Sequence, residues 1–315
     1  MQYREFLMHN ARQFGTLIGL IVLCVILWIL TPHFLTITNI LNITQQTSIN
    51  AIIAVGMTFV IITAGIDLSV GSIMAFAGVV LAGALNAGIP IPIAMLIGLG
   101  VGAACGLVNG LLITYGGLPP FISTLGMMSV ARGGALLYTD GRPVSGFSEG
   151  FRFLALGEIL SIPVPVVIMI VVYIIAHFLL TRTKFGRYTY AIGGNEEAAM
   201  LSGINIRFFK TAIYAFCGML SGLAAIILTA RLNSAQPIAG IMYELDAIAA
   251  AVIGGTSLMG GEGRITGTLI GALIMGVLRN GLNLLGVSSF VQQTVIGSVI
   301  IVAVLVDMAL KRQKN

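Results

Sequence analysis

The chain has 315 residues, of which 57% are hydrophobic and only 9% are charged. A soluble domain carries about 25% charged residues, so this composition excludes an ordinary soluble fold and indicates a polytopic membrane protein. The net charge of +5 comes from basic residues confined to short loops, without a basic face or an aromatic-basic motif, which argues against nucleic-acid binding.

Ten apolar runs are candidates for membrane spans. They cover residues 15–30, 49–64, 68–85, 90–114, 121–138, 162–180, 212–229, 245–258, 265–285 and 290–310. The second, third and eighth are short or broken by glycine, which is typical of helices that line a transport pathway. The sequence therefore predicts an all-α polytopic membrane protein with about ten transmembrane helices, in a single transmembrane domain over residues 1–315.

Lysine and arginine predict the orientation. With a cytoplasmic N-terminus, eleven basic residues fall in cytoplasmic segments and four, Arg142, Arg152, Arg231 and Arg279, fall in outer loops, while Arg132 lies within a span. This bias obeys the positive-inside rule, and with ten spans it places both termini in the cytoplasm. The largest outer loop, 139–161, is rich in glycine and proline and is expected to be ordered loop without a helix. It is either a spacer or a docking surface for an outer partner.

Small polar residues within the apolar runs are candidates for a translocation path. Asp67 is the only charge between Arg12 and Arg132, and either caps the third span or lines the path with Ser69 and Ser72. Asp246 stands at the start of the short eighth span. Asn50, Thr124 and Thr256 complete the predicted path, although hydrogen bonds between helices explain such residues equally well.

Residues 181–211 form the only long polar segment, and they contain a short helix signal. Gly193-Gly194 is expected to break the chain, after which Asn195 caps a helix. Glu196 and Glu197 then lie in its first turn, where the helix dipole favours anions, and Gly203 ends it.

Catalytic motifs are missing from the sequence. There is no Gly-Lys pair and hence no Walker A loop, no HExxH and no GxSxG. Cys24, Cys105 and Cys217 fall in apolar runs, and no spacing indicates a metal site. The chain is therefore not expected to be an enzyme or to hold a cofactor or metal.

Several segments together resemble the permeases of monosaccharide ABC importers, and among them those for ribose. The pattern Glu197-Ala198-Ala199-x-x-x-Gly203 has the spacing of the loop by which ABC importer permeases contact their ATPase. Longer matching segments are QQTSINAIIAVGMTFVI (45–61), AGIDLSVGS (64–72), GRYTYAIGGNEEAAMLSGIN (186–205), ARLNSAQPIAG (230–240), YELDAIAAAVIGGTSLMGGEGRITGTLIGALIMG (243–276) and NGLNLLGVSS (280–289).

The resemblance implies a multi-pass protein of the bacterial inner membrane, surrounded by lipid, with two copies forming the pore. A separate ABC ATPase, which binds ATP and Mg, would supply energy through a cytoplasmic coupling loop within residues 181–211. The contact would comprise Asn195, Glu196, Glu197, Ala198, Ala199 and Gly203, with the paired alanines as a flat helix face. An extracytoplasmic sugar-binding protein would deliver the sugar, ribose or another small sugar.

Other interpretations remain open from the residues alone. The helix at 195–203 could instead lie on the membrane surface. The chain could be an ion-coupled secondary transporter or channel for a small polar solute, with Asp67, Arg132 and Asp246 as its intramembrane charges. An intramembrane enzyme is disfavoured because no span offers a paired nucleophile and base.

Overall fold

The computed structural model describes residues 2–312, with side chains for residues 14–305. These residues form thirteen helices and four two-residue strands. The helices are α1 (Gln2–Leu30), α2 (Ile37–Ile62), α3 (Val70–Asn86), α4 (Ile91–Thr114), α5 (Pro120–Thr139), α6 (Glu149–Leu156), α7 (Val164–Arg182), α8 (Lys184–Gly194), α9 (Glu196–Leu201), α10 (Ile206–Leu232), α11 (Tyr243–Ile253), α12 (Ile265–Leu284) and α13 (Ser289–Arg312).

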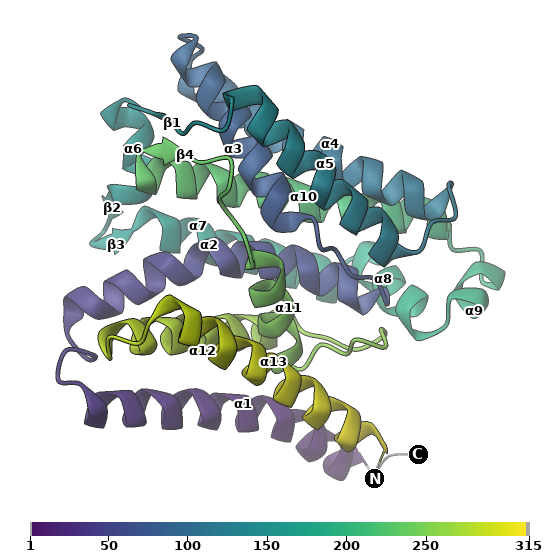
Figure 1. Cartoon of the computed structure of the whole chain (residues 1–315). Coiled ribbons are helices and arrows are strands. Elements are labelled where there is room, and N and C mark those ends of the chain that lie inside the picture. The colour runs from purple at the N-terminus through teal and green to yellow at the C-terminus, as the bar shows by residue number, and fades with distance from the viewer. Residues whose placement is uncertain (1, 313–315) are drawn as a thin grey trace.

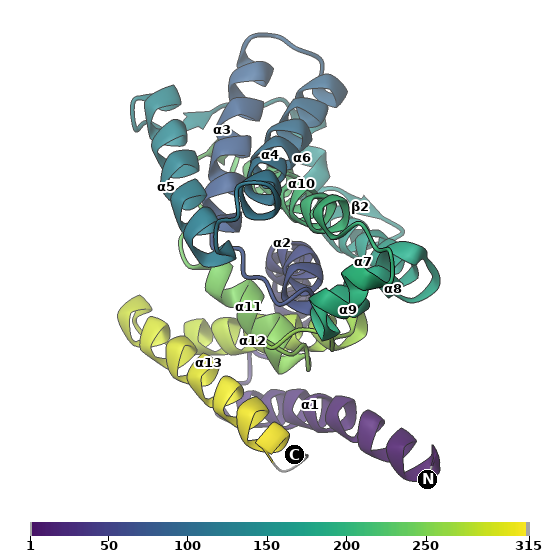
Figure 2. The ribbon, with the colours of Figure 1, turned by 90° about the vertical axis from the view of Figure 1, so that its right-hand side faces the viewer.

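The central helix is α2, which contacts α7, α10, α11 and α12. Figure 2 shows it enclosed by these helices. Every residue from Ala51 to Ile62 is buried. A helix that is apolar on all sides is stable only when other elements cover it on all sides, and α2 fulfils that condition.

A stripe of glycines lets α4 and α10 pack backbone to backbone. Gly98, Gly102, Gly106 and Gly110 recur every four residues and therefore share one face of α4. A Cβ atom at Gly106 would overlap the carbonyl oxygen of Tyr214 on α10, and Gly102 faces Gly218 in the same way. Close approach at small residues is how membrane helices gain packing energy where lipid removes the hydrophobic drive.

The short strands lie at one end of the molecule, and α8 and α9 lie at the other (Figure 1). Strand β1 (Val144–Ser145) pairs antiparallel with β4 (Ser234–Ala235), and β2 (Glu158–Ile159) pairs antiparallel with β3 (Ile162–Pro163). The first turns of α1 and the last turns of α13 point toward the end that carries α9.

Each of the ten expected spans contains a helix of the structure. By length and composition alone, five described helices, α2, α4, α7, α10 and α12, are long and apolar enough to cross a membrane. Three shorter apolar stretches, Phe14–Leu30, Val70–Asn86 and Ser289–Leu305, belong to α1, α3 and α13. The all-α membrane architecture is confirmed at this level.

Two expected boundaries are wrong. The second span, expected over 49–64, starts at Ile37, because Thr36 caps the helix and Asn39 is buried in an amide pair with Asn280. The eighth, expected over 245–258, ends at Ile253, so that Thr256 follows the helix in a turn.

Two predicted irregular segments also differ from the structure. The segment 139–161 is not a loop throughout, because it contains α6, whose Phe151 and Ala155 are one turn apart and buried together. The break predicted at Gly193-Gly194 comes one residue later, since both glycines form the last turn of α8 and the helix ends directly before the extended Asn195.

Candidate functional site

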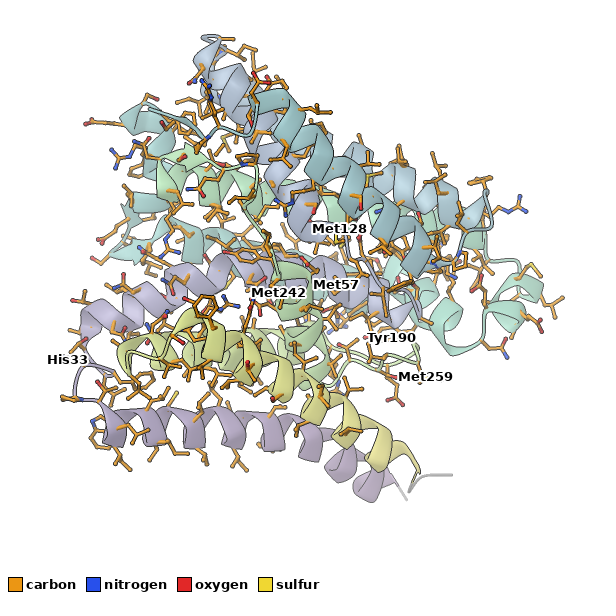
Figure 3. The ribbon with its side chains drawn as sticks, viewed as in Figure 1. His33, Met57, Met128, Tyr190, Met242 and Met259 are labelled. Atoms are coloured by element: carbon orange, nitrogen blue, oxygen red, sulfur yellow. The ribbon has the colours of Figure 1, made fainter. Side chains whose placement is uncertain are left out.

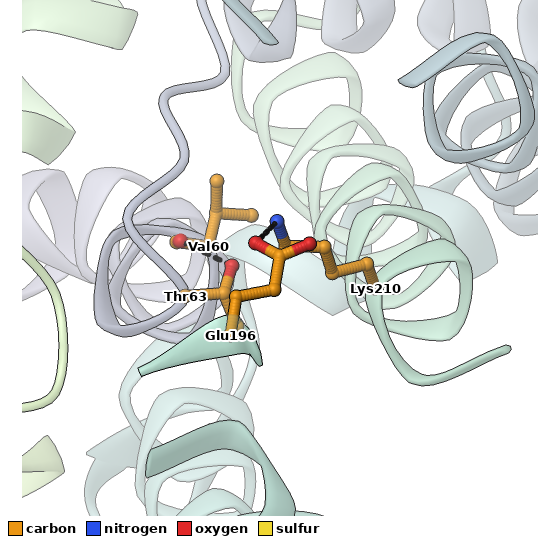
Figure 4. Close-up of polar contacts among 4 residues, drawn as sticks. All are labelled: Val60, Thr63, Glu196 and Lys210. Atoms are coloured by element: carbon orange, nitrogen blue, oxygen red, sulfur yellow. Dashed lines mark hydrogen bonds and ion pairs between the residues drawn. The ribbon is translucent and has the colours of Figure 1, made fainter. Parts of the chain in front are cut away.

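The predicted helix at 195–203 is present as α9. The Asn195 side chain accepts a hydrogen bond from the backbone N–H of Ala198 at 2.9 Å, as an N-cap does. Gly203 has a φ of +82°, the left-handed conformation expected where a helix ends at glycine. Glu196 pairs with Lys210 of α10 at 2.6 Å and so fixes the helix to α10 (Figure 4).

The outward face of α9 differs from the predicted pair of alanines. Ala198 is exposed but Ala199 is buried, so the two alanines do not form one flat face, as the rotation of about 100° between neighbouring residues of a helix allows. The exposed apolar residues are Met200 and Leu201, of which Leu201 is 86% exposed. Together with Glu197 and Ala198 they form an outward surface that mixes charge with apolar groups.

The preceding helix, α8, joins this surface to the centre of the molecule. Its Gly193 lies against the carbonyl oxygen of Ile62 at the end of α2, and a Cβ atom there would overlap that oxygen. The backbone N–H of Gly261 donates to the same oxygen at 2.9 Å. We call this meeting of residues 62–64, 193–194 and 260–261 the glycine junction.

Tyr190 adds a side-chain link between α8 and the same loop. Its hydroxyl donates to the carbonyl oxygen of Gly263 at 2.6 Å. Burial raises the pKa of Tyr190, so the hydroxyl keeps the proton that it donates. Tyr190 and Met259 both lie at the α9 end of the molecule, and His33 lies at the opposite end (Figure 3).

The chain between α10 and α12 is helical only in part. After Asn233, whose φ is +51°, the short strand β4 and a run of turns over 237–242 lead to α11, which has only 11 residues. Arg132 of α5 donates hydrogen bonds to the carbonyl oxygens of Pro237 and Ala239 at 2.6 and 2.7 Å. Arg132 thereby pairs two carbonyl oxygens of non-helical backbone, which a segment without regular secondary structure cannot pair within itself.

A cavity of about 420 Å³ opens beside the first turns of α11, bounded by α2, α10, α11 and α12. Its polar lining includes Thr47, Asn50, Arg231, Asp246 and Arg279. Asp246 is 2% exposed and accepts a hydrogen bond from the Arg279 guanidinium at 2.5 Å. The buried charge is thereby paired, which a carboxylate in so apolar a setting requires.

Some predicted path residues meet in this cavity and others do not. Asn50 and Asp246 lie beside each other in its wall. Asp67, Ser69 and Thr124 belong to a separate buried group. Ser72 and Thr256 are also buried, but at other places in the interior. None of these five lines the cavity.

The Asp67 group holds helices together. The carboxylate of Asp67 accepts from the backbone N–H and the hydroxyl of Ser69 at 2.9 and 2.5 Å. Asn109 of α4 donates to the Ser69 hydroxyl at 2.9 Å, and Thr124 of α5 donates to the carbonyl oxygen of Ile66 at 3.3 Å. The expectation that Asp67 caps a helix beginning at Leu68 is wrong, because α3 begins at Val70.

The cavity also contains residues that were not predicted. Arg279 had been assigned to an outer loop, but it lies within α12, and Arg231 lies in the last turn of α10. Both face the cavity, as do Gln46 and Asn283. An arginine within the apolar run 265–285 was the available signal for Arg279, because a charge inside a span is functional by default.

Known proteins are similar to this chain over most of its length. Residues 39–305 match the family described as branched-chain amino acid transport system / permease component. The ribose import permease protein of Bacillus subtilis (strain 168) is 54% identical over 298 residues, which cover 94% of this chain and 92% of that protein. Its counterpart in Escherichia coli (strain K12) is 54% identical over 296 residues, 93% of this chain and 92% of that protein.

A third relative carries a different sugar in its name. The D-allose transport system permease protein of Escherichia coli (strain K12) is 43% identical over 302 residues, which cover 95% of this chain and 93% of that protein. No solved structure matches the chain.

Proposed function

The chain belongs to the branched-chain amino acid transport system / permease component family, and we propose that it is the membrane-spanning permease of an ABC importer for ribose. The observation that carries this proposal is the 54% identity to ribose import permeases over more than nine tenths of both chains. The relative named for D-allose is less similar, at 43%. The protein is a multi-pass protein of the inner membrane.

The proposed topology has ten spans in a single transmembrane domain, with both termini in the cytoplasm. Two features support it: the excess of lysine and arginine on the proposed cytoplasmic side, and the shared end of the molecule at which α1 begins, α13 ends and α9 lies. The opposite end, with α6 and the strand pairs, then faces outward and receives a sugar-binding protein.

In this proposal, ATP hydrolysis by a partner subunit is coupled to the membrane spans through α9. A separate ABC ATPase, which binds ATP and Mg, contacts Glu197, Ala198, Met200 and Leu201, while Asn195 and Gly203 set the ends of the helix. Glu196 and Ala199 hold the helix to the protein from its inner side. The glycine junction then connects this surface to α2, and closure of the ATPase biases the spans between two states.

The translocation path in this proposal runs past Asn50 and Asp246 and is completed by a second copy of the chain. The residues around Asp67 and Ser69, with Ser72, Thr124 and Thr256, maintain helix packing beside that path. A path lined by an amide and by a carboxylate paired with Arg279 suits a neutral solute with many hydroxyls. An ion-coupled transporter would instead need unpaired charges facing water.

Reconstitution tests the function. The permease, its ATPase and its sugar-binding protein are placed in liposomes, and uptake of radiolabelled ribose is followed with and without ATP. ATP-dependent uptake, competed by ribose in excess but not by leucine, is the expected result. Uptake by the permease alone, driven by an ion gradient, would instead establish a secondary transporter.

A further inference from the structure

Three side-chain oxygens around the cavity beside α11 have no hydrogen-bond partner among the described residues. They are Oγ1 of Thr47, Oδ1 of Asn50 and Oδ1 of Asp246. Thr47 and Asp246 are each more than nine tenths buried, and all three residues line the same cavity. Buried polar atoms are nearly always paired, so three unpaired atoms in one cavity indicate a molecule that pairs with them.

The chemistry of the three atoms restricts that molecule. Carboxylate and amide oxygens accept hydrogen bonds only, and a threonine hydroxyl accepts as well as donates. The bound molecule must therefore donate several hydrogen bonds. A phosphate or a carboxylate would find donors in Arg231 and Arg279, but it has no hydrogen to donate to these three oxygens. Cations are disfavoured because Arg231 and Arg279 line the same cavity.

Part of the remaining lining is apolar, beside the polar side chains of Gln46, Tyr243 and Asn283. Leu228, Ala250, Ala272 and Met275 face the same space. A molecule with hydroxyls on one side and C–H groups on the other fits such a wall, because polar and apolar lining groups each find a counterpart. Gly276 also leaves room for the hydroxyl of Thr47, since a Cβ atom there would overlap it.

We propose that this cavity is a sugar-binding site within the permease, at which hydroxyl groups of a neutral monosaccharide donate hydrogen bonds to Thr47, Asn50 and Asp246. This assignment rests on the proposed sugar-import function and adds to it a place where the permease itself holds the sugar. Arg279 donates to Oδ2 of Asp246, and the Asn50 side chain also lies beside this carboxylate. The other carboxylate oxygen, Oδ1, has no partner at hydrogen-bond distance and is the one assigned to the sugar.

Two substitutions test the site in the complete importer. Thr47→Val keeps the shape of the side chain and removes the unpaired hydroxyl, and Asn50→Ala removes the amide. Each loses one hydrogen bond to the sugar, so ribose uptake should fall about three- to tenfold. Thr47→Val should leave the melting temperature unchanged or raised, because a buried hydroxyl without a partner is lost. A purely structural role for Thr47 predicts the reverse pattern.

Asn42→Ala is the matched control. Asn42 lies on the same helix as Asn50, two turns earlier, and is exposed. Its replacement should leave uptake at the wild-type level.

Chemical protection provides a readout that does not depend on turnover. The three native cysteines of the permease are replaced, and Asn50→Cys is introduced as its single cysteine. The assembled importer is then treated with a small methanethiosulfonate reagent. Ribose at millimolar concentration should slow the modification at least twofold, and leucine should not. Equal rates with and without ribose would overturn the site.

The outcomes separate the two proposals. If the wild-type importer takes up no ribose with ATP, the proposed function fails and the site fails with it. If the wild type takes up ribose and Thr47→Val, Asn50→Ala and Asn42→Ala all match it, the function stands and the cavity holds only water.

Discussion

Gly193 in the last turn of α8 lies directly against the carbonyl oxygen of Ile62, the last residue of α2. The segment that carries α9 thus meets the central helix through backbone alone, with no side chain between them. From Ile62 to Asn50 is twelve residues along one helix, or about 18 Å at 1.5 Å per residue. The glycine junction and the cavity are therefore two positions on a single helix.

A methyl group at this contact should separate the two helices. Gly193→Ala overlaps the Ile62 oxygen, and overpacking of this kind costs about 1–3 kcal/mol. We expect ribose uptake to fall at least fivefold while the ATPase still binds. Gly194→Ala is the control, because a Cβ atom at Gly194 meets nothing within 4 Å. Equal uptake by the two variants would remove the junction from the coupling route.

The end of α9 should tolerate only certain side chains. Gly203 has a φ of +82°, and an L-residue in the left-handed region costs about 1–2 kcal/mol, more if it is β-branched. Gly203→Val should misplace α9, so that ATP hydrolysis continues without uptake in an importer that still assembles. Gly203→Asn should retain most uptake, since asparagine accepts this conformation. Normal coupling in the valine variant would contradict the role of α9.

Arg132 should be required for the turns that precede α11. Hydrogen bonds to a charged donor contribute roughly 1.5–3 kcal/mol each, and Arg132 makes two to backbone carbonyls. Arg132→Met should lower the melting temperature of the purified permease and reduce uptake, and Arg132→Lys should restore part of both. Arg142→Met removes an exposed arginine and serves as the control. A stable, active methionine variant would show that the turns over 237–242 hold their shape without Arg132.

The α4–α10 contact should discriminate between glycines of one helix. Gly106→Ala places a methyl group on the carbonyl of Tyr214, whereas Gly100→Ala on another face of α4 meets nothing within 4 Å. We expect Gly106→Ala to destabilise the permease by about 1–3 kcal/mol in thermal unfolding in detergent. Gly100→Ala should be neutral or slightly stabilising, because alanine favours the helix. Equal unfolding temperatures would refute the backbone packing.

The sequence predicts those parts of the fold whose causes are local. Asn195 and Gly203 act within a few residues of the helix that they delimit, and both behave as expected. The ten apolar runs each contain a helix, because the length and composition of such a run are enough to identify a candidate membrane helix. That Ala198 and Ala199 point in different directions was also predictable, since helical geometry separates them by about 100°, but their contacts decide which of the two is buried.

Other features depend on contacts between distant segments. Polar residues between 36 and 48 hid the start of α2, whose Asn39 finds its partner, Asn280, on α12. The cavity brings together residues as far apart as Gln46 and Asn283, and one sequence holds no measure of that proximity. The four-residue spacing of Gly98, Gly102, Gly106 and Gly110, in contrast, was visible and predicts the tight face of α4.

The antiparallel pairing of β1 with β4 ties two surface segments to the cavity. Val144 pairs with Ala235, from which a run of turns leads to α11. A sugar-binding protein that contacts the loop around β1, as proposed above, would lie at one end of the segment that leads to Asp246, while α9 lies next to the end of the helix that carries Asn50. The proposed outer and cytoplasmic partners are thus connected to the cavity through different elements, at opposite ends of the molecule.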